Sequence, residues 1–201
     1  RNSVLSLVKK LVIMSGKTNK DQIKIEKKIN ISKLNQNQIN YIKSNFKHIF
    51  VFDNHTYGIT KRSISLKEVK NIHKKYRGYP VTINSENEND YITRFLSDHT
   101  NISSINIGIN DLDNEGKWVW FNKSNSNFTK WARGEPNNWK SREDYVSLMI
   151  RPSNQDLLEG KYAGTWNDIR GTNDSIRYNY LFEWDQNFIK KEYSQIDLKL
   201  F

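Results

Sequence analysis

The sequence predicts an α+β domain in which two helices are followed by several short strands and long loops. Two Ser-x-x-Glu capping boxes, at Ser65 and Ser85, each precede an apolar pattern with helical spacing. Short alternating or aromatic runs, separated by turn residues, fill the rest of the chain. Six Trp, ten Tyr and nine Phe among 201 residues indicate a packed core, because disordered chains are poor in aromatic residues.

The composition excludes several functional classes. Cysteine is absent, so the chain forms no disulfide, thiolate metal site or cysteine nucleophile. No apolar run approaches the roughly 20 residues of a membrane-spanning helix. Neither a His-Glu-x-x-His pair nor a Gly-x-Ser-x-Gly elbow is present, so we expect no enzymatic activity. The chain begins at Arg1 and shows no signal peptide, and we therefore expect a fragment or a processed product.

The net charge of +10 is unevenly distributed. Residues 1–80 contain 18 Lys/Arg and 4 Asp/Glu, a net charge of +14, whereas residues 81–201 contain 14 and 18, a net charge of −4. A basic surface can attract anionic glycans, membranes or nucleic acid. Because the lysines are scattered and accompany no nucleic-acid-binding motif, we interpret them as a solvated surface and expect no nucleic-acid partner.

Residues 1–46 are predicted to be a basic N-terminal appendage or the remnant of a preceding module. Apolar residues have helical spacing from Val4 to Val12 and alternate in places from Ile23 to Ile31. A further helix is expected to begin at Ser32, with Leu34, Ile39, Ile42 and Phe46 on one side.

The main domain is predicted over residues 47–185, followed by a C-terminal tail at residues 186–201. It opens with strands at His48–Phe52 and Thr56–Thr60, joined by a turn at Asp53-Asn54.

The two capped helices come next. The first follows Ser65 and is expected to end at Gly78, and the second follows Ser85. Their apolar faces are predicted to comprise Leu66, Val69, Ile72 and Tyr76 in the first, and Tyr91, Ile92, Phe95 and Leu96 in the second.

Short strands and loops complete the domain. Ile105, Ile107 and Ile109 alternate as in a half-buried strand. Further strands are expected at Trp118–Phe121, Tyr145–Ile150 and Tyr178–Trp184, with a polar connection from Arg151 to Gly164.

Oxygen-bearing side chains cluster in three loop-like stretches between residues 135 and 168. The stretches are Glu135-Pro136-Asn137-Asn138-Trp139, Glu143-Asp144-Tyr145-Val146 and Trp166-Asn167-Asp168. Calcium takes six to eight oxygen ligands at roughly 2.3–2.6 Å, and carboxylates and amides supply them. The three stretches therefore predict a calcium site assembled from different loops.

Together these features resemble the C-type lectin-like domain, over about residues 48–185. The resemblance rests on the helix pair, Ile107-Gly108-Ile109, Glu115-Gly116-Lys117-Trp118, the Glu-Pro-Asn loop, the Glu143-Asp144 pair, Trp166-Asn167-Asp168 and Phe182-Glu183-Trp184. It implies a C-type lectin-like fold, with two helices, two small antiparallel sheets and a long calcium-binding loop region. It also implies a cis peptide bond between Glu135 and Pro136.

The missing cysteines are the clear departure from the family, which usually has two disulfides. Their positions correspond to His73 with Phe182 and to Tyr145 with Gly171. Packing must substitute for these bonds, and we expect Tyr145 to lie over Gly171. The cysteine-free pattern resembles bacterial members of the family.

The resemblance implies one calcium held by Glu135, Asn137, Glu143, Asn167 and Asp168, with sugar hydroxyls completing its coordination. A second, supporting calcium would use Asp111, Glu115, Asn138 and Asp144, although Asn138 replaces a usual Asp and removes one charge. The Glu-Pro-Asn order resembles the arrangement that binds mannose, glucose, GlcNAc or fucose.

Trp139 has two interpretations, because a Trp serves both roles. It stacks on a sugar ring, as in galactose-preferring members of the family, or it covers a loop. The other tryptophans are predicted to lie in the core: Trp118, Trp120, Trp131, Trp166 and Trp184.

The sequence as a whole predicts a non-enzymatic, calcium-dependent, carbohydrate-binding lectin, extracellular or at the cell surface, with a role in adhesion. One alternative is a lectin-like domain that binds a protein or ice. Another is a receptor-binding segment of a larger adhesin or toxin, in which residues 1–46 dock on another domain.

Overall fold

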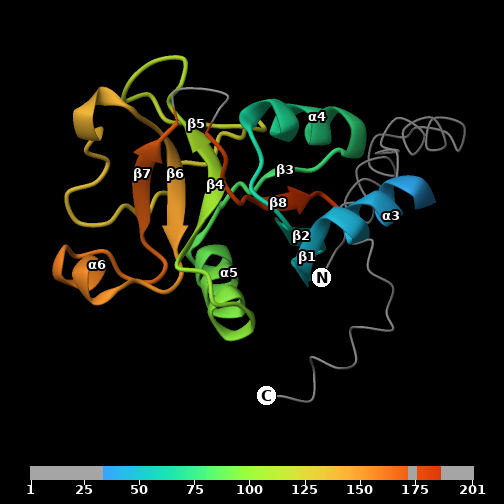
Figure 1. Ribbon diagram of the computed structural model, residues 1–201, viewed down its shortest axis with the longest axis horizontal. Coiled ribbons are helices and arrows are strands. Elements are labelled where there is room, and N and C mark those ends of the chain that lie inside the picture. Colours follow the sequence, from blue (N-terminus) through green and yellow to red (C-terminus); the bar gives the residue numbers. More distant parts are fainter. Residues whose placement is uncertain (1–33, 172–175, 187–201) are drawn as a thin grey trace, which may run out of the picture. The chain divides into compact units, whose positions relative to one another are not determined.

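The computed structural model describes residues 34–171 and 176–186. Within these ranges the strands form two four-stranded antiparallel sheets, ordered β1-β2-β8-β3 and β5-β4-β6-β7 (Figure 1). The patterns noted between Val4 and Ile31 and almost all of the predicted tail lie outside the described residues. The predicted α+β arrangement with two small antiparallel sheets is confirmed.

The first sheet joins the beginning and the end of the domain. Strands β1 (Phe46–Phe52) and β2 (His55–Thr60) form a hairpin, and β2 pairs with β8 (Leu181–Trp184), which also pairs with β3 (Tyr79–Pro80). The hairpin turn takes positive φ angles at Asp53 and Asn54, which are residues that tolerate the left-handed region. The predicted strands are thus present, although β8 begins three residues later than expected.

Helix α3 (Gln36–Asn45) begins four residues later than predicted, because Asn35 caps it, and Ser32 lies outside the described residues. The Asn35 side chain accepts from the Gln38 N–H, and the Gln38 side chain accepts from the Asn35 N–H. The helix packs on α4 (Leu66–Tyr76), where the Tyr41 and Tyr76 rings stack with centroids 3.6 Å apart.

Helix α3 lies within the range predicted as an appendage, and it shares a hydrophobic cluster with α4 and β8. Leu34, Ile42 and Phe46 belong to this cluster, together with Phe182 and Trp184. The division of the chain at residues 46/47 and 185/186 stays a prediction.

Helix α4 has the predicted capping box but ends differently. Ser65 Oγ accepts from the Glu68 N–H and Glu68 Oε2 accepts from the Ser65 N–H. Arg77, not Gly78, takes the left-handed conformation that ends the helix, with φ 59°. Gly78 is needed for another reason, since a Cβ there would lie 2.4 Å from the indole ring of Trp184.

Helix α5 (Glu86–His99) has only half of the predicted capping box. Ser85 Oγ accepts from the Glu88 N–H at 3.2 Å. The Glu88 carboxylate instead accepts from the Asn84 N–H and from the Tyr57 hydroxyl, both at 2.8 Å. The Glu88 carboxylate thus binds the buried Tyr57 hydroxyl and not the Ser85 N–H. This hydrogen bond connects α5 to β2.

The second sheet carries the loops that hold the oxygen clusters. It comprises β4 (Ser104–Asn110), β5 (Val119–Trp120), β6 (Glu143–Met149) and β7 (Trp166–Arg170). The prediction that β4 is half-buried was wrong, because both of its faces are covered. At Gly108 the chain passes so close to β3 that a Cβ would lie 2.3 Å from the Pro80 carbonyl oxygen.

The tryptophans divide between the core and its edge. Trp120, Trp166 and Trp184 are buried as predicted, whereas Trp118 and Trp131 are half-buried and pack against the core. The Trp166 ring lies at the centre of this group and meets Trp120, Phe128 and Trp131 at steep interplanar angles.

The predicted packing at one of the two disulfide positions is present. Tyr145 lies over Gly171 so closely that an added Cβ would fall 1.5 Å from Tyr145 Cδ2, as expected. At the other pair of positions, the His73 ring packs edge-on against Phe121, while Phe182 packs against Phe46, Tyr180 and Trp184.

Two connections contain short helices that the sequence did not indicate. The turn η1 (Trp139–Ser141) precedes β6, and α6 (Asn154–Leu158) lies in the connection between β6 and β7. Ser153 and Asp156 form a capping box at α6. None of the helices in the described part of the chain is both long enough and apolar enough to cross a membrane.

Candidate calcium and carbohydrate site

The buried carboxylate of Asp168 holds the Glu-Pro-Asn loop against the sheet. Asp168 lies on β7, is fully buried and pairs with Val146 of β6. Its oxygens accept from the backbone N–H of Asn137, at 3.0 and 3.1 Å, and of Asn138, at 2.7 Å. Charged acceptors form the stronger class of hydrogen bonds, so this carboxylate fixes a loop that is 30 residues distant in sequence.

Glu135 lies at the start of the same loop, and its side chain is only 4% exposed. The Glu135–Pro136 peptide bond is cis, as predicted. Asn137 Nδ2 donates to Glu135 Oε2 at 2.5 Å. Burial, and then the neighbouring Asp168 carboxylate, raise the pKa of Glu135 to about 7, while Lys161 opposes the shift. Two acids thus share a site that is short of positive charge.

Glu143 closes the loop from the beginning of β6. Glu143 Oε2 accepts from the Trp139 N–H at 2.8 Å, and the Glu143 N–H donates to Asn138 Oδ1 at 3.2 Å. Burial raises the pKa of the Glu143 carboxyl, and the Asp168 charge adds to the shift. Glu143 therefore belongs to the same group of acids as Glu135 and Asp168.

Asn167 contributes a buried oxygen that lacks a donor. Its Nδ2 donates to the Asp168 carbonyl at 2.7 Å, but its Oδ1 has no hydrogen-bond partner among the described residues. An unpaired buried polar atom is unfavourable unless something satisfies it. A cation that prefers oxygen ligands would do so, and the adjacent carboxylates suit calcium.

The four residues predicted for a second ion also lie together. Asp111 follows β4 and is buried, and its N–H donates to the Asp144 carbonyl at 3.2 Å. Desolvation, and then the Asp111 and Asp144 charges, raise the pKa of Glu115, while the Asn138 side chain lowers it. Burial and the Asp111 charge raise the pKa of Asp144 as well.

Two oxygens of this second group are buried without a partner among the described residues, Asp111 Oδ1 and Asp144 Oδ2. The other Asp111 oxygen accepts from the Gly116 N–H at 2.8 Å. Asn138 Oδ1 is already engaged by the Glu143 N–H. These oxygen-bearing side chains fit a calcium ion. Asn138 Oδ1 would have to release the Glu143 N–H in order to bind the ion.

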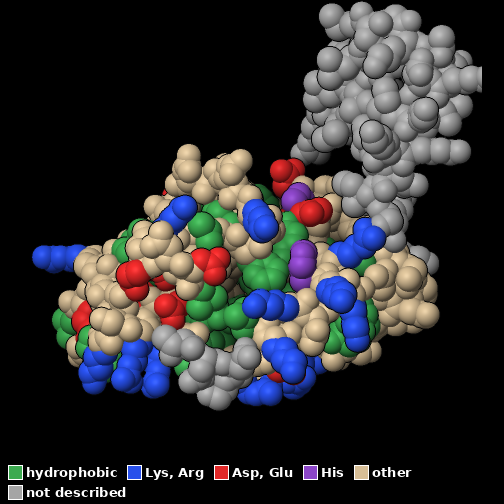
Figure 2. All heavy atoms as spheres, turned by 90° about the horizontal axis from the view of Figure 1, so that it is seen from above, with side chains coloured by type: hydrophobic (Ala, Val, Ile, Leu, Met, Phe, Trp, Pro, Cys, Tyr) green, Lys and Arg blue, Asp and Glu red, His purple; other side chains and the backbone are tan. Residues whose placement is uncertain are grey.

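Trp139 is 62% exposed on η1, next to the loop that Asp168 holds. The Lys140 ammonium lies 4.0 Å from the centroid of its ring. A side chain that is open to solvent is available to a ligand, and the opposite ring face is the one that Lys140 leaves free. Figure 2 shows acidic side chains in two places on the face seen from above, toward the left and beside a histidine near the upper edge, with Lys and Arg side chains around them.

Sequence reasoning missed Lys161, which lies beside Glu135. Its ammonium is 3.6 Å from Glu135 Oε1 and 3.1 Å from Glu159 Oε2, and its side chain is 19% exposed. The residue sits in the connection predicted only to be polar, and no spacing or motif relates it to Glu135.

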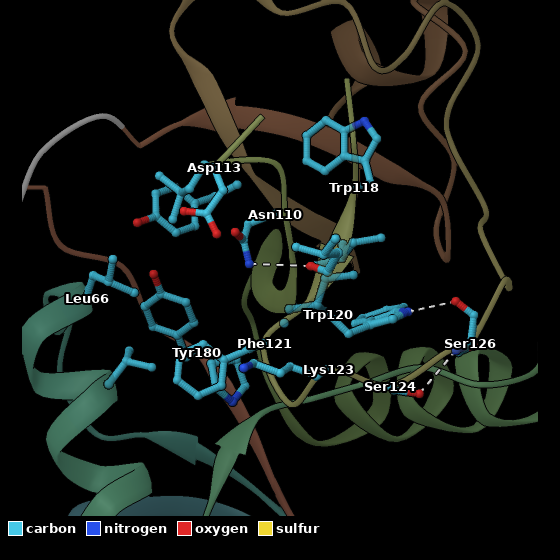
Figure 3. Close-up of a pocket in the computed structure, with 18 of the residues that line it drawn as sticks. Leu66, Asn110, Asp113, Trp118, Trp120, Phe121, Lys123, Ser124, Ser126 and Tyr180 are labelled. Carbon is cyan, nitrogen blue, oxygen red and sulfur yellow. Dashed lines mark hydrogen bonds between the residues drawn. The ribbon is translucent and has the colours of Figure 1, made fainter. Parts of the chain in front are cut away.

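A cavity of the described structure lies elsewhere. A cavity of about 590 Å³ lies between α4, β4 and the loop that follows β5, and none of the nine predicted calcium ligands lines it. Figure 3 shows Trp120, Phe121 and Tyr180 along this cavity, with the Trp120 indole N–H donating to the Ser126 carbonyl at 3.1 Å. Its Trp120 and Tyr180 walls are buried core residues.

A third polar group lies in the first sheet. His55, Glu183 and Asp185 bring their ligand atoms within 4.8 Å of one another. His55 Nδ1 and Glu183 Oε1 are 2.5 Å apart, and the Tyr79 hydroxyl donates to Asp185. These contacts pair the three side chains with one another and with Tyr79.

Comparison with known proteins identifies the family. The family model of the Lectin C-type domain matches residues 62–180. The chain belongs to the C-type lectin family. This is a family of carbohydrate-binding lectins that are generally non-enzymatic.

Individual C-type lectins show the same relationship. Lectin BRA-3 of Megabalanus rosa is 38% identical over 65 residues, which are 32% of this chain and 38% of that protein. The low affinity immunoglobulin epsilon Fc receptor of Mus musculus is 38% identical over 92 residues, which are 45% of this chain and 26% of that protein. The chain therefore spans about a quarter to two fifths of these two curated relatives.

Solved structures agree with the fold. The mouse scavenger receptor C-type lectin carbohydrate-recognition domain superposes with a TM-score of 0.55 at 25% identity, covering 71% of this chain and 97% of that one. The C-type lectin CEL-I from Cucumaria echinata gives a TM-score of 0.54 at 22% identity, covering 68% and 94%. The predicted C-type lectin-like fold is confirmed.

Proposed function

We propose that this chain binds carbohydrate through a calcium ion held by Glu135, Asn137, Glu143, Asn167 and Asp168. The observation that carries the proposal is Asn167 Oδ1, which is buried and has no hydrogen-bond partner among the described residues. It belongs to the residue next to Asp168, whose charge raises the pKa of Glu135 and of Glu143. Calcium, when bound, would supply the positive charge that these acids lack and coordinate two adjacent sugar hydroxyls. The match to a family of lectins supports carbohydrate as the ligand rather than a protein or ice.

The residues of the chain have separate tasks in this proposal. Asp168 positions the loop through its three hydrogen bonds to Asn137 and Asn138. Glu135 accepts and Asn137 donates hydrogen bonds, so this pair can distinguish the orientation of sugar hydroxyls. The order Glu-Pro-Asn favours the mannose, glucose, GlcNAc and fucose type, and exposed Trp139 is placed to stack on the ring.

We also propose a supporting calcium at Asp111, Glu115, Asn138 and Asp144. The buried Asp111 Oδ1 and Asp144 Oδ2 support it, because each would otherwise lack a partner. An extracellular or cell-surface location and a glycoconjugate partner follow from the family and are part of the same proposal.

The test is retention on mannose-agarose in calcium and release by EDTA. The Glu135→Gln/Asn137→Asp variant exchanges the acceptor and the donor, and its preference is expected to shift toward galactose. Glu86→Gln serves as the control, because Glu86 is an exposed acid that pairs with Lys130. Retention that EDTA leaves unchanged would show that the assigned site does not bind the sugar.

A further inference from the structure

Lys161 is held firmly beside the primary group of acids. It follows Gly160, whose φ of +80° places it in the left-handed region that suits glycine, and the Lys161 N–H donates to the Asp156 carbonyl at 2.8 Å. A Cβ at Gly160 would lie 2.9 Å from Arg133 Cβ. The connection after α6 is therefore packed against the segment that immediately precedes Glu135.

The Lys161 ammonium lies between two carboxylates of different exposure. Glu135 Oε1 is 3.6 Å away on a side chain that is 4% exposed, and Glu159 Oε2 is 3.1 Å away on a side chain that is 46% exposed. Glu135 is a proposed calcium ligand near Asp168, whereas Glu159 is not. Lys161 can thus lose its contact with Glu135 and keep its contact with Glu159.

We propose that Lys161 is an internal counter-ion that competes with calcium for Glu135 and so sets the calcium affinity of the primary site. The inference rests on the proposed function. Without calcium, the ammonium offsets the repulsion between Glu135 and Asp168, which their burial intensifies. Calcium must displace it from Glu135, because two cations cannot share this oxygen without repulsion. Glu159 then keeps the displaced ammonium.

The experiment is calcium titration by calorimetry of the full chain, as the natural protein and as Lys161→Gln. We expect the dissociation constant of Lys161→Gln to fall by about tenfold. Thermal unfolding gives a second measurement, since Lys161→Gln is expected to be less stable than the natural protein in EDTA but not in saturating calcium.

Two variants separate a local contact from a general effect of charge. Lys140→Gln removes the same charge from η1, where the lysine lies over Trp139, and its calcium dissociation constant is expected to change by no more than about twofold. Lys130→Gln removes a half-buried lysine that also bridges two carboxylates, Glu86 and Asp90, and it is expected to have no effect on calcium.

The possible results distinguish the two proposals. Calcium binding by the natural protein with an unchanged or weaker affinity in Lys161→Gln would overturn the counter-ion role alone. An equal gain in Lys161→Gln and Lys140→Gln would overturn it too, because the effect would then be general. No calcium binding by the natural protein or by any variant would overturn the proposed function as well.

Discussion

Gly171 lies directly beneath the ring of Tyr145, at positions where the family resemblance implies a disulfide in other members. The Tyr145 side chain is buried and fills the space that any side chain at residue 171 would need. The contact joins the beginning of β6 to the chain that leaves β7. The Gly171 N–H also donates to the Arg142 carbonyl at 3.3 Å, and the packing contact depends on the fit between Tyr145 and Gly171.

Replacing Gly171 by Ala is expected to destabilise the domain by about 1–3 kcal/mol, since overpacking forces neighbouring atoms aside. Tyr145→Ala in the same chain should reduce that loss, so the two changes are expected to be non-additive. Chemical denaturation of the single and double variants measures the coupling. Gly58→Ala is the control with a smaller expected loss, because its methyl would meet Phe46 Cβ at 3.3 Å.

The His55–Glu183 pair makes a separate contribution that depends on pH. The hydrogen bond with Glu183 raises the pKa of His55, with Asp185 and Glu88 adding to the shift, while burial opposes it. A raised folded-state pKa stabilises the protein below the unfolded value of about 6.5, and this contribution is lost as pH rises through the folded-state pKa. Burial also raises the pKa of Glu183, which shifts stability in the same direction.

We therefore expect the melting temperature of the natural protein to exceed that of His55→Asn by more at pH 6 than at pH 9. Thermal unfolding across this range measures the difference. His48→Asn should show the opposite trend, because burial and Lys47 lower the pKa of His48. A pH-independent difference for His55→Asn would contradict the assigned pairing.

At the scale of elements, α4 shows how a local signal and a tertiary contact cooperate. The sequence predicts its capping box from Ser65 and Glu68. In the structure Glu68 also pairs with Arg62 and Arg177, at 2.6 and 2.7 Å. The helix thereby contacts chain segments before and after it, and its apolar face carries Val69 and Ile72 into the core.

Ser65→Ala is expected to cost about 1 kcal/mol of unfolding free energy, because the first turn loses an acceptor for a backbone N–H. Denaturant unfolding is the measurement. The same change at Ser153, which caps the exposed five-residue helix α6, should cost less, since no residue of that helix is buried. Equal losses would show that the core does not depend on α4 more than on α6.

At the scale of the whole molecule, the second sheet holds the Glu-Pro-Asn loop through Asp168 of β7. Asp168 accepts three hydrogen bonds from the Glu-Pro-Asn loop, whereas the neighbouring Asn167 Oδ1 accepts none from the described residues. Asp168 is therefore needed to hold the loop in place, and Asn167 is available to an ion.

This difference predicts opposite behaviour of two adjacent variants. Asp168→Asn should lose about 1–3 kcal/mol of stability even in EDTA, because it weakens the acceptors of buried N–H groups. Asn167→Ala should be close to neutral in EDTA but should lose most of the rise in melting temperature that calcium produces. Thermal unfolding of both variants with and without calcium tests the prediction, and a large loss for Asn167→Ala in EDTA would contradict it.

The sequence by itself determined the helix pair, the family and the spacing of the oxygen-bearing residues, because caps, periodicity and motifs are local patterns. It misplaced the start of α3 and the end of α4, where Asn35 and Arg77 took the roles expected of Ser32 and Gly78. Only the tertiary structure decided that Gly78 lies under Trp184 and that Glu88 turns to Tyr57. It also placed Lys161 beside Glu135, since contacts between distant residues depend on packing that no local pattern records.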